Sequence, residues 1–299
     1  MKLTFLGTSA GESYPALWCH CPNCEYARIH GGRNLRQNSC AFLDDDVMID
    51  LSSHAFHSAL RYGVDITRMR YLFVTHDHRD HFDSQHLVWR GLPFEDGGMR
   101  PITQPFDMEV SIRQMGARHT PVPHLDMYGH ESILAALEQN PRFHSKDMEN
   151  DYAMSFHPLS RGDTVTLQDL SVTALVSHHG VPGSVMNYIF TRSGKTLLYA
   201  LDCGGYDEDM LDILRGCRFD CVVLEGTFGH MPVEFSMHQN KEKNLRMWKF
   251  FSDNHLWADR PRMILSHMAP HWTPPHDLYE KEMAAYGIEV AYDGLTIQV

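Results

Sequence analysis

The chain of 299 residues lacks any apolar run that approaches the ~18–20 residues needed to cross a bilayer. Its first residues, 1–7, read as a strand leading into a turn rather than as a secretory leader. It is also poor in basic residues: 26 Lys and Arg stand against 38 Asp and Glu, so the net charge is −12. Binding to nucleic acid depends mainly on neutralising phosphate, so this balance argues against such a partner. We therefore expect a cytoplasmic protein without a membrane segment.

The number and spacing of the cysteines indicate metal binding rather than disulfides. The chain holds seven cysteines, an odd number, and without a secretory leader disulfides are not expected. Three of them, Cys19, Cys21 and Cys24, follow a C-x-C-x-x-C spacing on a turn that contains proline and asparagine. This spacing brings three thiolates close enough to bind one metal ion, and a tetrahedral structural zinc then needs a fourth ligand. The sequence therefore predicts a structural zinc site near the N-terminus.

Histidine, by contrast, is abundant, with 21 residues, and one cluster of it is dense. Residues 76–81, with the sequence HDHRDH, directly follow the apolar, strand-like residues 71–74. A loop at the end of a buried strand can aim several side chains at one point. Imidazole and carboxylate together suit zinc, manganese or iron. A histidine-rich surface loop is the alternative, but so many potential ligands behind one strand favour a metal site.

This motif resembles the H-x-H-x-D-H signature of the metallo-β-lactamase fold superfamily of metal-dependent hydrolases. The resemblance implies that His76 and His78 bind a first metal and that Asp80 and His81 bind a second. It also implies an α/β fold, the metallo-β-lactamase αββα four-layer sandwich. Residues 18–33, which hold the three cysteines, are similar to the zinc site of the phosphoribosyl 1,2-cyclic phosphate phosphodiesterase group, of the carbon–phosphorus lyase pathway. The pyrroloquinoline quinone biosynthesis B proteins carry a similar cysteine cluster.

The same resemblance assigns three later strand ends to the metals. The strand that ends at His178 and His179 supplies the third ligand of the first metal; His179 is the better match and His178 is the alternative. Asp202 resembles the aspartate that bridges both metals, although Cys203 stands where threonine is common. His267 resembles the last ligand of the second metal.

The fourth ligand of the cysteine site is less well defined by the resemblance. The family places it in a T-H-x-x-H motif, and in this chain serine replaces the threonine. The second histidine falls one residue later than in the motif, as His271, and His276 is the reserve candidate. Either imidazole would complete a tetrahedral zinc site with three thiolates.

Three further residues are expected to act around the catalytic metals. Asp80, besides binding the second metal, is expected to steer the attacking water. His238, at the start of a predicted helix, resembles the catalytic histidine of the cyclic phosphodiesterase group, and His230 is the alternative. Asp50, at a strand end, either orients a ligand histidine or caps the helix that follows. The sequence does not separate these two roles of Asp50.

The resemblance runs through most of residues 1–299, so we expect one domain. A glycine- and proline-rich stretch at about residues 92–118 is expected to be a loop-rich insertion beside the active site. Residues 287–292 and 295–299 are expected to form a C-terminal hairpin over Asp293 and Gly294.

The resemblance implies a metal-dependent hydrolase that cleaves a small, cyclic phosphodiester. The resemblance implies a hydroxide shared by two divalent metals, Zn, Mn or Fe, and one further structural zinc. The expected partner is a small-molecule phosphodiester, and a homodimer is left open. Three alternatives remain: hydrolysis of a lactone, ester or thioester; ribonuclease Z-like RNA processing; and a cofactor-biosynthesis or metal-binding role similar to the quinone B proteins. The presence of all the expected ligands favours an enzyme.

Overall fold

The structure, a computed structural model, describes residues 1–91, 121–143, 146–232 and 237–299, so the insertion expected at 92–118 lies outside the described residues. The strands of one sheet are β1 (Lys2–Gly7), β2 (Cys40–Leu43), β3 (Val47–Ile49), β4 (Tyr71–Phe73), β5 (Leu125–Gly129), β6 (Met154–Pro158) and β14 (Thr296–Gln298). Those of the other are β7 (Thr164–Leu167), β8 (Leu170–Val176), β9 (Met186–Arg192), β10 (Lys195–Ala200), β11 (Phe219–Glu225), β12 (Trp257–Ser266) and β13 (Ile288–Val290). The α-helices described are α1 (Pro22–His30), α2 (Ala55–Tyr62), α3 (Gln85–Val88), α5 (Ser132–Glu138), α6 (Met148–Tyr152), α7 (Glu208–Arg215), α8 (Lys241–Asp253) and α9 (His276–Ala284).

Strand order shows where the parallel strands lie. The first sheet runs β14-β1-β2-β3-β4-β5-β6 and the second runs β13-β12-β11-β10-β9-β8-β7. Strands β3 to β6 pair in parallel, as do β10 to β13. Parallel strands are usually covered on both faces, which explains why β10 and β11 read as nearly continuous apolar runs. Among the residues that the structure describes, no helix is both long and apolar enough to cross a lipid bilayer.

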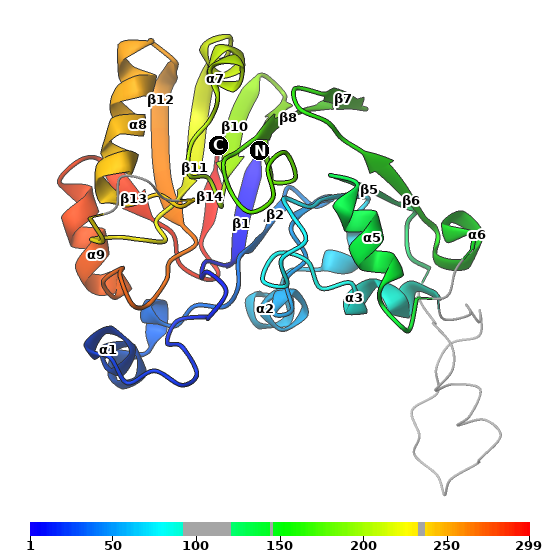
Figure 1. Ribbon diagram of the computed structural model, residues 1–299, viewed down its shortest axis with the longest axis horizontal. Coiled ribbons are helices and arrows are strands. Elements are labelled where there is room, and N and C mark those ends of the chain that lie inside the picture. The colour runs from blue at the N-terminus through cyan, green and yellow to red at the C-terminus, as the bar shows by residue number, and fades with distance from the viewer. Residues whose placement is uncertain (92–120, 144–145, 233–236) are drawn as a thin grey trace, which may run out of the picture.

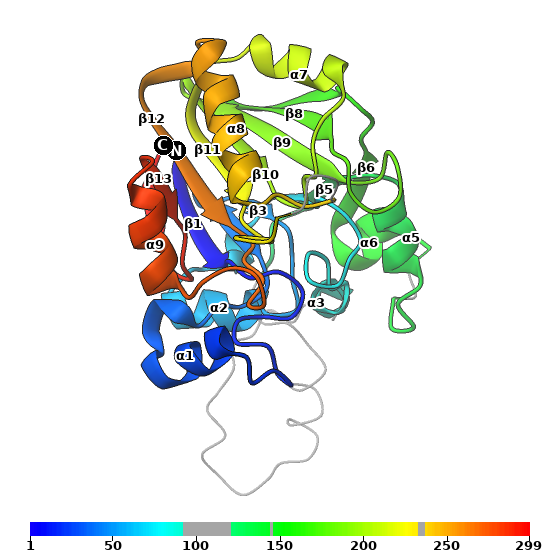
Figure 2. The ribbon, with the colours of Figure 1, turned by 60° about the vertical axis from the view of Figure 1, so that its left-hand side comes forward.

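The two sheets pack face to face, and helices cover both outer faces (Figure 1, Figure 2). Between the sheets, Phe73 of β4 meets Tyr188 of β9 with ring centroids 5.3 Å apart. A second core lies under α7, α8 and α9 and contains Phe251, and a third lies under α2 and α5 and contains Leu137. These layers are the αββα sandwich that the sequence predicted.

The expected C-terminal hairpin is wrong. β13 pairs in parallel with β12 in the second sheet, whereas β14 pairs antiparallel with β1 in the first. Between these strands, the carboxylate of Asp293 accepts hydrogen bonds from the Thr8 hydroxyl and the Gln37 backbone, both at 2.6 Å. Gly294, with φ of 90°, donates to the carbonyl of Phe5 at 2.7 Å. These contacts hold the chain where it crosses from one sheet to the other, so each strand pairs with a separate edge.

Candidate metal centre and active site

The candidate site lies where the C-terminal ends of strands from both sheets meet. Ligands in open α/β sheets commonly bind at this end of parallel strands. All the residues expected to hold the two catalytic metals gather there in two sets: His76, His78 and His179, and Asp80, His81, Asp202 and His267. The sequence placed each of these residues at the end of a strand, and the fold brings those strand ends together.

The first set consists of three imidazoles whose ligand nitrogens lie within 4.8 Å of one another. His76 and His179 are buried and His78 is exposed, with the rings of His76 and His78 4.4 Å apart between centroids. The Nε2 atom of His76 is buried and has no hydrogen-bond partner among the described residues. A buried ring nitrogen without a hydrogen bond is costly unless another group binds it. Its position therefore fits a metal ligand.

The second set also has its ligand atoms within 4.8 Å of one another. The Nε2 atoms of His81 and His267 are 3.1 Å apart, so two ring nitrogens face the same point. Oδ2 of Asp202 lies 2.7 Å from Nε2 of His81 and 3.5 Å from Nε2 of His76. One carboxylate therefore touches ligands of both sets, as expected of a residue that bridges two metals.

The residues of the second set perturb one another's charge. Burial acts to lower the pKa of His81, but the carboxylates of Asp50 and Asp202 raise it well above its usual value. Burial acts to raise the pKa of Asp202, but His267 and His81 lower it well below its usual value. Both shifts favour the charged forms, because buried carboxylates draw positive charge towards them. Carboxylates and imidazoles that together favour a positive charge between them suit divalent cations.

The backbone is unusual at three of the strand ends. Asp50, Asp202 and His267 have φ angles of 60°, 50° and 57°. Residues other than glycine rarely adopt this left-handed region, and where they do, surrounding contacts must hold them there. Such residues cluster at functional sites, and here all three are among the ligands or directly support one.

Asp50 supports a ligand rather than capping a helix. Its Oδ2 lies 2.7 Å from Nδ1 of His81, and its Oδ1 accepts a hydrogen bond from the Thr75 backbone at 2.7 Å. The N-cap of α2 is His54 instead. A partner on the second ring nitrogen fixes the tautomer of a ligand histidine and leaves Nε2 for the metal. This settles the choice that the sequence left open.

His238 lies beside both sets, and it is held by a residue that the sequence reasoning missed. Glu225, the last residue of β11, is fully buried, and its Oε2 lies 2.8 Å from Nδ1 of His238. Nδ1 is also 3.2 Å from Oδ1 of Asp202. Burial acts to lower the pKa of His238, but Glu225 and Asp202 raise it to about 10. A carboxylate at the end of a buried, apolar strand was the available signal for Glu225.

Two of the alternative histidines make contacts elsewhere. Nε2 of His178 lies 2.7 Å from Oδ1 of Asp207, and the side chain is 54% exposed. Nε2 of His230 lies 2.7 Å from Oε2 of Glu282. Within the described part of the chain, neither belongs to a group that could hold a metal ion. The geometry therefore favours His179 as the ligand.

At the N-terminus, the three cysteine sulfurs lie within 4.8 Å of one another. Nδ1 of His271 is 3.5 Å from Sγ of Cys19. His276 is fully buried elsewhere, with Nδ1 3.1 Å from the guanidinium of Arg36. Burial and Arg36 together lower the pKa of His276 to about 3. His271 is therefore the better-placed fourth ligand.

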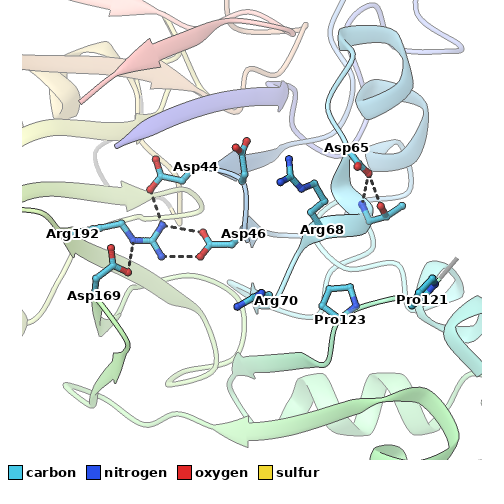
Figure 3. Close-up of a pocket in the computed structure, with 11 residues that line it drawn as sticks. Asp44, Asp46, Asp65, Arg68, Arg70, Pro121, Pro123, Asp169 and Arg192 are labelled. Carbon is cyan, nitrogen blue, oxygen red and sulfur yellow. Dashed lines mark hydrogen bonds and ion pairs between the residues drawn. The ribbon is translucent and has the colours of Figure 1, made fainter.

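Two hollows differ in their relation to these sites. One of about 710 Å³ lies at the N-terminal ends of β3 and β4, opposite the ligand sets (Figure 3). One of the guanidinium groups that line it, that of Arg192, is already paired with Asp44, Asp46 and Asp169. Another hollow, of about 460 Å³, is lined in part by His179. The second hollow adjoins the first ligand set and is a candidate space for substrate.

Comparison with known proteins agrees with this fold. The family described as beta-lactamase superfamily domain matches residues 109–268. A ribonuclease Z of Synechococcus sp. (strain CC9902) is 24% identical over 347 residues, which cover 100% of this chain and 98% of that protein. A diphosphatase of the PhnP family has a similar fold, with TM-score 0.67, 19% identity and coverage of 99% and 96% of the two chains. Zn(2+)-bound PqqB from Methylobacterium extorquens does too, with TM-score 0.69, 16% identity and 100% of both chains covered.

Proposed function

The chain belongs to the β-lactamase superfamily of metal-dependent hydrolases, and we propose that it is a di-metal phosphodiesterase acting on a small, cyclic phosphodiester. The observation that carries this proposal is the position of Asp202, within 3.5 Å of one histidine from each ligand set. Because Oδ2 of this carboxylate faces both sets, Asp202 is placed to contact two cations at once. Pairs of cations are a common means of cleaving phosphate esters.

The donor atoms suit zinc, manganese or iron. We propose that one cation is held by His76, His78 and His179, the other by Asp80, His81 and His267, and that Asp202 contacts both. When bound, two such cations lower the pKa of water towards neutrality and offset the charge that builds on phosphate. The Asp80 side chain is 19% exposed, against 3% for Asp202. Asp80 is therefore the ligand carboxylate placed to orient a water molecule that enters from solvent.

His238 is proposed to protonate the leaving alkoxide. Its Nδ1 faces the buried carboxylate of Glu225, which stabilises the doubly protonated ring. The Lys243 ammonium donates to the backbone carbonyl of His238 at 3.0 Å, so α8 holds the main chain of this residue as well. The ring lies 4.6 Å from that of His179 between centroids, next to the first ligand set. A general acid in this position contributes ~10²–10⁴-fold to the rate.

A substrate screen tests the proposal. Protein loaded with zinc or manganese is assayed against bis-p-nitrophenyl phosphate, a cyclic phosphodiester, a lactone and a thioester. We expect metal-dependent hydrolysis of the phosphodiesters that His76→Ala abolishes. The matched control is His57→Ala, because this exposed histidine of α2 lies outside every group of described residues that could hold a metal ion. Turnover of the lactone or thioester alone would contradict the proposed substrate class.

The two other candidates have their own outcomes in the same screen. The similarity to a ribonuclease Z calls for an RNA among the substrates, although the net charge of −12 opposes strong binding to RNA. Bound metal without turnover of any substrate would favour a metal-binding role like that of a cofactor-biosynthesis protein.

A further inference from the structure

The histidine beside the cysteine cluster has an acidic partner on its far side. Nδ1 of His271 faces Sγ of Cys19 at 3.5 Å, and Nε2 of the same ring lies 2.7 Å from Oε2 of Glu12. A neutral imidazole carries one proton, and a carboxylate can only accept a hydrogen bond from it. Glu12 therefore places the proton on Nε2 and leaves the lone pair of Nδ1 directed towards Cys19.

The backbone on both sides of this pair is held in place. The loop after β1 and the loop after β12 are joined by hydrogen bonds from Met268 N to Thr8 O at 2.9 Å and from Ala10 N to Met268 O at 3.1 Å. The side-chain amide of Asn23, in α1, donates to the carbonyl of Pro270 at 2.9 Å. The loops that carry Glu12 and His271 thus keep a fixed relation to the helix that carries Cys24.

A second glutamate–histidine pair lies beside the same three cysteines and provides a comparison. Nδ1 of His20, between Cys19 and Cys21 in sequence, lies 2.7 Å from Oε1 of Glu25. The His20 side chain is 82% exposed, whereas that of His271 is 29% exposed. Its contact with Cys19 and its lower exposure make His271, rather than His20, the ring aimed at the thiolates.

We propose that Glu12 is a positioning residue that holds His271 in the tautomer needed to complete a tetrahedral zinc site with the three cysteines. Ligand histidines in zinc sites commonly donate their other ring N–H to a carboxylate, and loss of that partner weakens metal binding by ~10–100-fold. Three thiolates and one imidazole form a recognised structural zinc set. This inference concerns the N-terminal site alone and does not depend on the substrate of the enzyme.

Cobalt binding tests the proposal through a signal that is separate from activity. Metal-free protein is titrated with Co²⁺, and the thiolate-to-cobalt absorption reports the cysteine site, because no cysteine occurs in the catalytic ligand sets of the described residues. Glu12→Ala is expected to weaken Co²⁺ at this site by ~10–100-fold and to change the ligand-field bands. Glu12→Gln, whose amide oxygen still accepts a hydrogen bond, is expected to fall between Glu12→Ala and the natural protein.

Glu25→Ala is the matched control, since Glu25 also binds a histidine beside the cysteines. It should leave both the affinity and the bands unchanged. Unchanged binding in Glu12→Ala, or an equal loss in both alanine variants, would overturn the proposal. A loss confined to Glu25→Ala would also overturn it and make His20 the fourth ligand.

Discussion

Replacing His238 by alanine separates proton transfer from metal binding. The side chain contacts the carboxylates of Glu225 and Asp202 through Nδ1, at 2.8 and 3.2 Å, and it is not among the ligands proposed for either cation. Its removal should therefore leave both catalytic metals bound while the rate falls. Removal of Asp202, proposed to contact both cations, should lower metal occupancy and rate together.

The size of the loss follows from the role proposed for His238. With a phosphodiester whose leaving group is a poor alkoxide, kcat of His238→Ala should fall ~10²–10⁴-fold, or about 3 to 5 kcal/mol of barrier. With bis-p-nitrophenyl phosphate the loss should be much smaller, because p-nitrophenolate needs little protonation. Glu225→Gln keeps a hydrogen-bonding group but removes the charge next to Nδ1. With the substrate that has the alkoxide leaving group, kcat of this variant should fall on the order of 10-fold.

The assay is steady-state hydrolysis of both substrates, with metal content measured on the same samples. Equal losses on the two substrates would reject the general-acid role and leave phosphate binding as the function of His238. Full activity on both substrates would show that His238 is not the general acid. The role would then pass to His230, whose ring pairs with Glu282 in this structure, or be withdrawn. Loss of metal from His238→Ala would show that this ring is a ligand after all.

Three further predictions concern metals and stability. Protein purified without chelator should contain about three metals per chain, two in the ligand sets and one at the cysteines; a value near one that reconstitution does not raise would contradict the di-metal centre. Cys21→Ser should lose zinc and melt at a lower temperature while folded protein keeps most of its turnover, because zinc held by thiolates contributes folding free energy directly; normal melting with lost activity would make this site catalytic. Burial raises the pKa of Asp293 to about 6, so between about pH 4 and pH 6 the folded protein holds a proton on this carboxyl that the unfolded chain has lost. Raising the pH from about 4 to 6 should therefore lower the free energy of unfolding of the natural protein, relative to that of Asp293→Asn, by on the order of 2–3 kcal/mol. Chemical denaturation at both pH values measures this difference, and a constant difference would show that Asp293 does not titrate in that range.

Much of the candidate site could be predicted because its ligands are local features of the sequence. The HDHRDH run directly follows a buried strand, and Asp202 and His267 each stand at the end of another. The αββα layers followed from the resemblance that these motifs carry. Other features depend on contacts between distant segments, and the sequence could not supply them. The role of Glu225 could not be predicted because it depends on contact with His238, which is distant in sequence. The hairpin predicted over Asp293 was wrong because each of its two strands fits equally well at the edge of a separate sheet.

The sequence by itself determined which residues could bind metal, since residue type and short spacing fix the donor chemistry. The tertiary structure decided which of those residues do meet. His178 and His179 are neighbours in the chain, yet one pairs with Asp207 and the other joins His76 and His78. His271 and His276 are close in sequence, yet one faces Cys19 and the other lies against Arg36. The physical reason is that the direction of a side chain at a strand end depends on local backbone angles, and its partners come from loops on other strands that only the packed sheets bring within reach.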